Sequence, residues 1–148
     1  MTYVYVLNED DAGNKYVLYP LPGDDGAGNP LAAGPRHRIP ARDQNWQITS
    51  AGGREVFLVI ASREPIGNVE ESLAKLEPAE AGRAVAVARL DPNAAGQLRG
   101  VGGMVPVDPE GEAGRPGSAS VVDQISSTLS GSKGVKLIRI ELSNPGPG

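Results

Sequence analysis

The sequence predicts a mainly β protein (α+β by content), with an antiparallel β-sandwich-like core and one or two helices inserted before the last strand. Three observations predict this fold. Short runs of β-branched and aromatic residues fill the N-terminal half. Helical spacing of apolar residues follows in the second half. The 148 residues fit one domain, and 20 glycines and 13 prolines between the apolar runs are typical of a chain with many turns.

The N-terminus predicts a β-hairpin. Residues 3–7 are apolar at every position, which is typical of a buried strand, and residues 16–19 form a similar run. Residues 8–14, rich in Asp, Asn and Gly, predict the turn between them. Pro20 ends the second strand because proline has no N–H to donate to a ladder.

The next segment predicts a long loop and then the central strand. Residues 21–35 are rich in Gly, Pro and Asp, and residues 36–40 could form a short edge strand. Residues 46–49 alternate, which puts Trp46 and Ile48 on one face. Glycines at 52 and 53 predict a tight turn, and residues 55–62 predict a strand covered on both faces.

Helical patterns follow this strand. Residues 69–77 predict a helix with Asn68 as N-cap, Glu71 completing a capping box, and Pro78 as the stop. Residues 84–90 fit either a strand or a short helix, and residues 93–117 predict a loop.

The C-terminal part predicts a second helix and the last strand. The helix begins at residue 119 or 120 and ends at 129, with Gly131 as its stop and an apolar stripe formed by Val121, Ile125 and Leu129. Residues 135–142 predict a half-buried strand, with two charged residues on one face (Arg139, Glu141) and three apolar residues on the other (Ile138, Ile140, Leu142). We expect residues 1–143 to form a single β-rich accessory domain and residues 144–148 a flexible Pro/Gly tail.

Composition excludes several functions. There is no cysteine, which excludes disulfides, thiol catalysis, zinc–thiolate sites and iron–sulfur clusters. A net charge of −4 argues against nucleic-acid binding. No apolar run approaches the ~20 residues of a membrane span, and no signal peptide is visible. We expect a domain cut from a longer protein, and an extracytoplasmic location is slightly favoured over a cytoplasmic one.

The residues predict no catalytic, cofactor-binding or metal-binding site. His37, the one histidine, lies between Arg36 and Arg38, and these positive neighbours disfavour the imidazolium that acid–base catalysis must form. We interpret it as a solvated edge residue. Eighteen acidic residues leave open a hydrolase that uses two carboxylates, but this signal is too permissive to identify a pair.

Three loop motifs favour turns over ligand sites. Residues 8–14 and 24–26 are acidic, but neither has the alternating acids and final glutamate of an EF-hand loop, so a loop-borne calcium site stays an open alternative. The glycines at 100–103 and 131–134 lack the strand–helix context of a phosphate-binding loop and predict connectors. For the aromatic residues (Trp46, Tyr3, Tyr5, Tyr16, Tyr19), core packing is favoured over a binding platform.

Residues 3 to about 66 resemble a bacterial domain of unknown function that is commonly joined to caspase-like peptidases and serine/threonine protein kinases. The resemblance is carried by the order and spacing of residues 3–8, Gly13, residues 17–20, residues 29–31, Gly34, residues 38–40, Trp46 and residues 53–62. It implies an accessory β-rich module whose neighbour carries the activity, and it supplies no functional residues. The chain itself has neither a Cys–His dyad nor the kinase signature set.

We therefore expect a non-catalytic accessory, interaction or sensor domain of a larger multidomain bacterial protein. Its partner would be another protein or the attached catalytic domain, and the partner-binding residues and oligomeric state are not predicted. Two alternatives stay open: a passive structural spacer and a cryptic carboxylate-based hydrolase.

Overall fold

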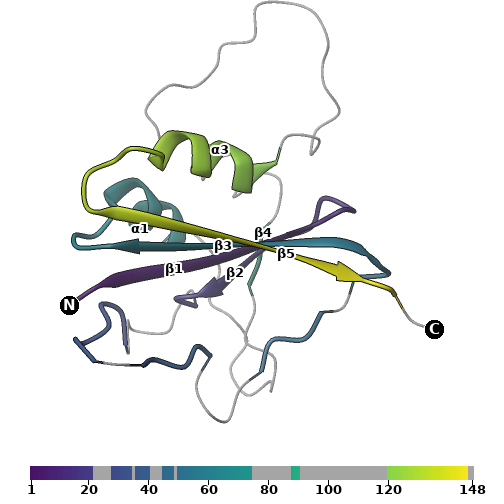
Figure 1. The fold of residues 1–148 in the computed structure, drawn as a ribbon, viewed down its shortest axis with the longest axis horizontal. Coiled ribbons are helices and arrows are strands. Elements are labelled where there is room, and N and C mark those ends of the chain that lie inside the picture. Colours follow the sequence, from purple (N-terminus) through teal and green to yellow (C-terminus); the bar gives the residue numbers. More distant parts are fainter. Residues whose placement is uncertain are drawn as a thin grey trace, which may run out of the picture.

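The computed structural model describes residues 1–21, 28–34, 36–40, 45–48, 50–74, 88–90 and 120–146. Five antiparallel strands form one sheet in the order β4-β2-β1-β3-β5 (Figure 1). The strands are β1 Tyr3–Asp10, β2 Lys15–Tyr19, β3 Gly53–Ser62, β4 Ala88–Leu90 and β5 Val135–Asn144. Helices α1 (Gly67–Ala74) and α3 (Val121–Leu129) both precede β5. The predicted mainly β, antiparallel fold with helices before the last strand is confirmed. In place of the second sheet of a sandwich, the described residues pack helices on one face of this single sheet and a loop segment on the other.

The predicted N-terminal hairpin is present, but its first strand is longer than expected. Residues 8–10, predicted as part of the turn, continue β1 because they pair with β3 along its whole length, from Tyr3↔Ser62 to Asp10↔Glu55. The turn is closed by Asp10, whose Oδ1 accepts the backbone N–H of Asn14 at 2.8 Å. Gly13, with φ of 83°, supplies the left-handed backbone there.

One face of the sheet, called here the helix face, packs against α3 and α1. Its buried core contains Tyr5, Leu7, Leu58 and Ile60 from the central strands. Helix α3 adds the predicted stripe of Val121, Ile125 and Leu129, together with Val122. Figure 1 shows α3 lying along the sheet, so the layer opposite this face is helical.

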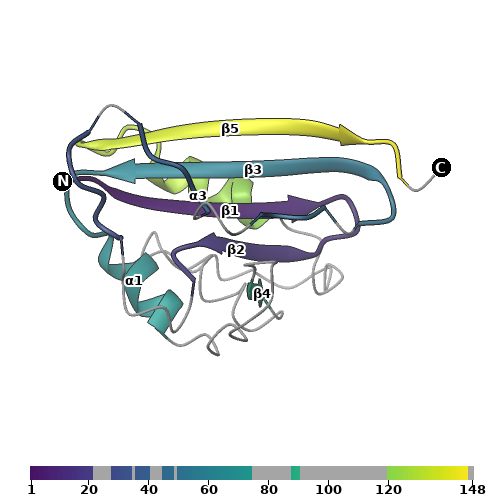
Figure 2. The same ribbon diagram turned by 90° about the horizontal axis from the view of Figure 1, so that it is seen from below.

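The other face, called here the loop face, is covered by described parts of the connection between β2 and β3 (Figures 1 and 2). Val4, Val6 and Leu18 are buried there, with half-buried apolar residues packed around them: Tyr16, Tyr19, Leu31, Ile39, Trp46, Phe57 and Val59. The connection is fixed at its start by paired backbone hydrogen bonds between Thr2 and Leu31, of 2.9 and 2.8 Å.

Two expected strands in this connection do not form. Residues 36–40 are loop, with Ile39 packed inward. Residues 46–48 are also loop, and Trp46 is half-buried while Ile48 is 45% exposed, so the two do not share a buried face. Tertiary packing explains both cases, because this segment lies across the sheet as a cover and does not join its ladder.

The first helix begins earlier than predicted. Helix α1 starts at Gly67, so Asn68 lies in the first turn and not at the N-cap position. The carbonyl of Ile66 accepts from the N–H groups of Val69 and Glu70 at 2.8 and 2.9 Å. Predictions for residues 75–77, 84–87 and 93–117 lie outside the described residues, whereas 88–90 are a strand.

The last helix follows the prediction in position and burial, whereas the last strand follows it in position only. Helix α3 ends at Leu129, and β5 runs two residues further than expected, to Asn144. Ile138, Ile140 and Leu142 do share a face, but they are 45%, 43% and 44% exposed. The expectation that this apolar face is buried was wrong, because β5 is the last strand of the sheet and the described part of the cover leaves these three side chains exposed.

Candidate interaction surface on the loop face

A small cleft opens on the loop face beside the β1–β2 hairpin. Its volume is about 60 Å³, and it is lined by Asn8, Asp10, Tyr16, Leu18, Trp46, Gln47, Ile48, Ser50, Glu55 and Phe57. Pockets for drug-sized ligands occupy roughly 300–1,000 Å³. The cleft therefore admits the end of one side chain or a few water molecules, since one water needs about 10–15 Å³.

The floor of the cleft carries two carboxyl groups that are direct neighbours across β1 and β3. Asp10 and Glu55 face each other in the register and are 6% and 3% exposed. Glu55 accepts from the Asn8 side-chain amide at 3.0 Å and from the Ser50 hydroxyl through its other oxygen. Within the described residues, neither carboxyl forms an ion pair. Buried carboxyl groups are stabilised by hydrogen bonds or by a cation, and in the described part of the chain hydrogen bonds supply that stabilisation.

The hydrogen bonds of these carboxyl groups are structural in character. Both oxygens of Asp10 are held by Asn14, at 2.8 Å from its backbone N–H and 2.7 Å from its side-chain amide. Both Glu55 oxygens are also held. The two groups lie side by side on one sheet surface, whereas a glycosidase pair flanks its substrate from two sides. This arrangement fits turn closure and strand alignment better than acid–base catalysis.

Trp46 forms part of the cleft wall. It packs against the loop-face core, and its indole Nε1 is buried with no hydrogen-bond partner in the described part of the chain. A buried unpaired donor costs about 1–3 kcal/mol. The tryptophan is thus a core residue, as expected, whose side chain also lines the cleft.

Next to the cleft lies a row of exposed aliphatic side chains on β5, called here the apolar row: Ile138, Ile140 and Leu142. The register places Phe57 beside Ile140 and Glu55 beside Leu142, so the row is continuous with the cleft across β3. Sequence periodicity grouped these three residues correctly, but no local signal indicated that they would be exposed.

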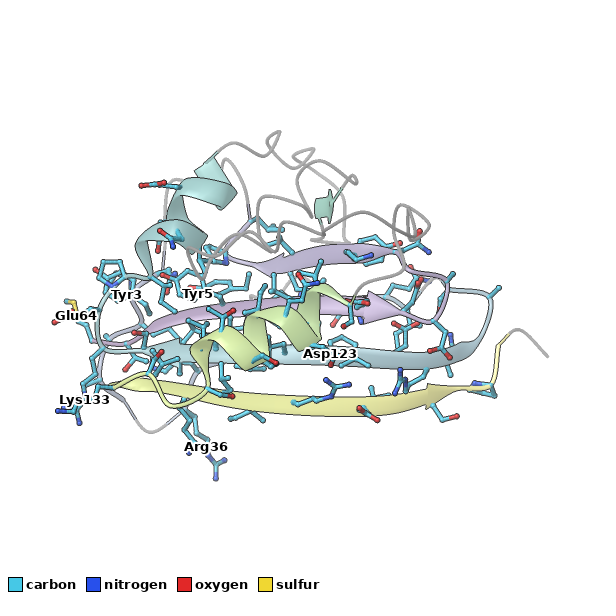
Figure 3. All side chains as sticks on the ribbon, turned by 90° about the horizontal axis from the view of Figure 1, so that it is seen from above. Tyr3, Tyr5, Arg36, Glu64, Asp123 and Lys133 are labelled. Carbon is cyan, nitrogen blue, oxygen red and sulfur yellow. The ribbon has the colours of Figure 1, made fainter. Side chains whose placement is uncertain are left out.

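The tyrosines divide between the two faces and support the core interpretation. Tyr5 is 1% exposed on the helix face, where its hydroxyl donates to Glu70 at 2.5 Å. Burial and this carboxylate raise the pKa of Tyr5 well above its ordinary value of 10.0. Tyr3 packs on the same face, as Figure 3 shows, while Tyr16 and Tyr19 pack on the loop face.

A cluster of charged side chains lies on the helix face of β5, which is the face opposite to the apolar row. Arg139 contacts Asp123 of α3 and lies 2.8 Å from Glu141 on its own strand. Its guanidinium lowers the pKa of Asp123, and the two carboxylates raise the pKa of Arg139. Because these side chains are exposed, the cluster contributes little to stability.

Several candidates from the sequence are located by the structure. His37 is exposed on the loop, with Nε2 2.8 Å from the carbonyl of Ala32. Asp11, in the acidic turn, accepts from the backbone N–H of Arg54 at 2.6 Å. The glycines at 131 and 134 lie in the turn between α3 and β5, which agrees with the predicted connector. Residues 24–26 and 100–104 lie outside the described residues.

Among the described residues, no group of three or more His, Asp or Glu side chains could hold a metal ion. The described helices are all too short and too polar to span a bilayer.

Comparison with known families finds a match over the N-terminal part of the chain. Residues 1–65 match the model of a domain of unknown function, DUF4384. This match includes β1, β2, β3 and every residue that lines the cleft, whereas α3 and the apolar row lie outside it. No curated protein and no solved structure matches the chain.

Proposed function

We propose that this chain is a non-catalytic interaction domain of a larger multidomain bacterial protein, and that it binds a protein partner on the loop face of its sheet. Its partner would be the attached catalytic domain, a kinase or a caspase-like peptidase. The proposal is motivated by the resemblance of residues 3 to about 66 to a domain commonly joined to such enzymes; residues 1–65 match a domain of unknown function.

The observation that carries this proposal is the apolar row on β5. Three adjacent aliphatic side chains, each more than 40% exposed, lie on one strand beside the half-buried Phe57 and Val59. Single exposed apolar residues are common on monomeric proteins, but a contiguous patch bordered by polar groups is typical of an interaction surface.

The cleft beside the row adds a preference for the partner's chemistry. Its two buried carboxyl groups, Asp10 and Glu55, favour a cationic side chain, and the aromatic ring of Trp46 would stack on a guanidinium. The preferred ligand is therefore a segment with aliphatic side chains and one Lys or Arg.

The test is a calorimetric titration of this chain with the separately expressed remainder of its parent protein. Ile140→Lys should weaken binding about tenfold or more, because burying one such side chain contributes about 1.5–3 kcal/mol. Thr128→Lys, which adds the same charge at an exposed position of α3, is the matched control. Equal affinities for the two variants, or no binding by the unmodified chain, would count against the proposal.

A further inference from the structure

The backbone edge of β5 is the feature that the proposed partner does not use. β5 is the last strand of the sheet, and within the described residues its outer edge has no neighbouring strand over the ten residues Val135–Asn144 (Figure 2). Alternate N–H and C=O groups of such an edge point outwards and can pair with another strand. Natural edge strands avoid this with unpaired charges, prolines or bulges.

These protective devices are weak in β5. Its central charges neutralise one another, since Arg139 contacts both Glu141 and Asp123, and Lys136 near its start is the remaining charge on the strand. The register with β3 runs without a bulge from Val135 to Asn144, and the strand contains no proline. The described segments between β2 and β3 run in the layer below the sheet (Figure 1), and the Arg36 side chain extends past the outer side of β5 when the sheet is seen from above (Figure 3). Among the described residues, no other strand pairs with this edge of the sheet.

We propose that a second copy of this chain occupies this edge, with the two β5 strands paired antiparallel about a twofold axis at Ile140. In this register, Ile140 of one copy lies opposite Ile140 of the other. Ile138 of each copy lies opposite Leu142 of the other, so the aliphatic side chains of both copies meet on the loop face. Arg139 of each copy faces Glu141 of the other on the helix face. Opposite charges directly across a pair of strands stabilise it, and like charges destabilise it.

Charge complementarity selects this register over its neighbours. The nearest alternative registers keep the loop faces of the two copies on the same side of the joined sheet. In these registers the twofold axis moves by one residue, to Arg139 or Glu141. An axis at Arg139 would place two guanidinium groups together, and an axis at Glu141 two carboxylates. The strand is thus self-complementary about Ile140 alone among these three positions.

The pairing would join the two sheets into one and place the two apolar rows side by side. Nine facing positions, residues 136–144, would supply about eight to ten backbone hydrogen bonds. The partner surface of the proposed function would then be a double row of six aliphatic side chains. The dimer itself rests on the backbone edge, so it can exist whether or not that function is correct.

The absence of cysteine makes a direct test possible. The purified chain of residues 1–148 carrying Ile138→Cys, Ile140→Cys or Leu142→Cys is oxidised mildly, and its disulfide-linked dimer is measured. Cα atoms directly opposite each other lie about 4.5–5.5 Å apart, within disulfide range. The two copies of Ile138, or of Leu142, would be displaced by four residues along the strands. This adds about 13 Å to their separation, which puts them outside disulfide range.

We expect Ile140→Cys to form the dimer rapidly and the other two single variants at least tenfold more slowly. An equimolar mixture of Ile138→Cys and Leu142→Cys should cross-link rapidly, because these residues face each other. Ile48→Cys is the matched control, since Ile48 and Ile138 are equally exposed, at 45%. Thermal unfolding of each reduced variant checks that it is folded.

Two results would overturn the proposal. Rapid cross-linking of Ile138→Cys or Leu142→Cys with itself would show another register. Equal, slow cross-linking of all variants and the Ile48→Cys control, with a monomer in sedimentation, would show that no second copy binds. The parent remainder is absent from these experiments, so their failure is separate from failure of the proposed function.

Discussion

The Glu9 side chain of β1 caps the N-terminus of α3, more than 110 residues further along the chain. Substitution of Glu9 therefore tests directly how the sheet stabilises α3. Its Oε2 accepts from the N–H groups of Val121 and Val122 at 2.9 and 3.2 Å, and from the Ser120 hydroxyl at 3.2 Å. The first N–H groups of a helix have no partner within it, and a carboxylate there also interacts favourably with the helix dipole.

The magnitude follows from these contacts. Glu9→Gln keeps an oxygen acceptor but loses the charge, which should lower the free energy of unfolding by about 1 kcal/mol. Glu9→Ala leaves two N–H groups without their acceptor and should lower it by about 2–3 kcal/mol, as for a charged hydrogen-bond partner. The melting temperature should fall by roughly 2–4 °C per kcal/mol for a chain of this size.

Urea unfolding measures these differences, and amide hydrogen exchange at Val121 and Val122 locates them. Glu64→Gln is the matched control, because Glu64 is exposed in the bend after β3 (Figure 3). The reasoning would be refuted if Glu9→Gln and Glu64→Gln had the same stability and the two amides kept their protection. Ser120→Ala in combination with Glu9→Gln should show coupling, since the two side chains touch.

Three further predictions concern the core, a turn and alkaline pH. Leu58→Ala should lower the free energy of unfolding by about 3–5 kcal/mol in urea, because Leu58 is 0% exposed, whereas Ile48→Ala should change it little. Gly53→Ala should cost about 1–3 kcal/mol, because its φ is +107° and a Cβ would lie 2.8 Å from the Asp11 carboxylate. Gly67→Ala, with nothing near its Cβ, should be neutral or stabilising by thermal unfolding. The pKa of Tyr5 is raised in the folded state, so its stabilising contribution is complete below pH 10.0 and is lost as pH rises further. Urea midpoints measured from pH 8 to pH 11 should therefore decline less in Tyr5→Phe than in the unmodified chain, and parallel curves would contradict this linkage.

The local sequence pattern was sufficient to predict those elements whose apolar positions coincide with the side chains that the fold buries. Residues 55–62 are apolar at nearly every position, and β3 is covered on both faces, so sequence and burial agree. The stripe of Val121, Ile125 and Leu129 has the helical period and packs on the sheet as expected. In both cases the chain's own spacing determines which side chains can be buried together.

Local pattern was insufficient where the partner of a segment lies far along the chain. Residues 8–10 have turn-forming residue types, but their pairing with β3 keeps them in a strand. Residues 46–48 alternate like a strand, yet they cover the sheet as a loop, because Trp46 fits the loop-face core. Propensity is a weak preference that tertiary contacts override.

The candidate surface shows the same division. Alternation in residues 138–142 identified an apolar side and a charged side, and that assignment is confirmed. Whether the apolar side is buried depends on which strand is last in the sheet, which no local spacing encodes. The cleft likewise requires Asp10, Glu55 and Trp46 to meet from separate segments.

The sequence by itself determined that this protein is mainly β, that one or two helices precede its last strand, and that this chain has no thiol chemistry. Only the tertiary structure decided that those helices cover one face of the sheet while a loop covers the other. It also decided that the apolar row of β5 is exposed to solvent. The physical reason is that residue periodicity specifies which side chains share a face, whereas sheet order and long-range packing specify what lies against that face.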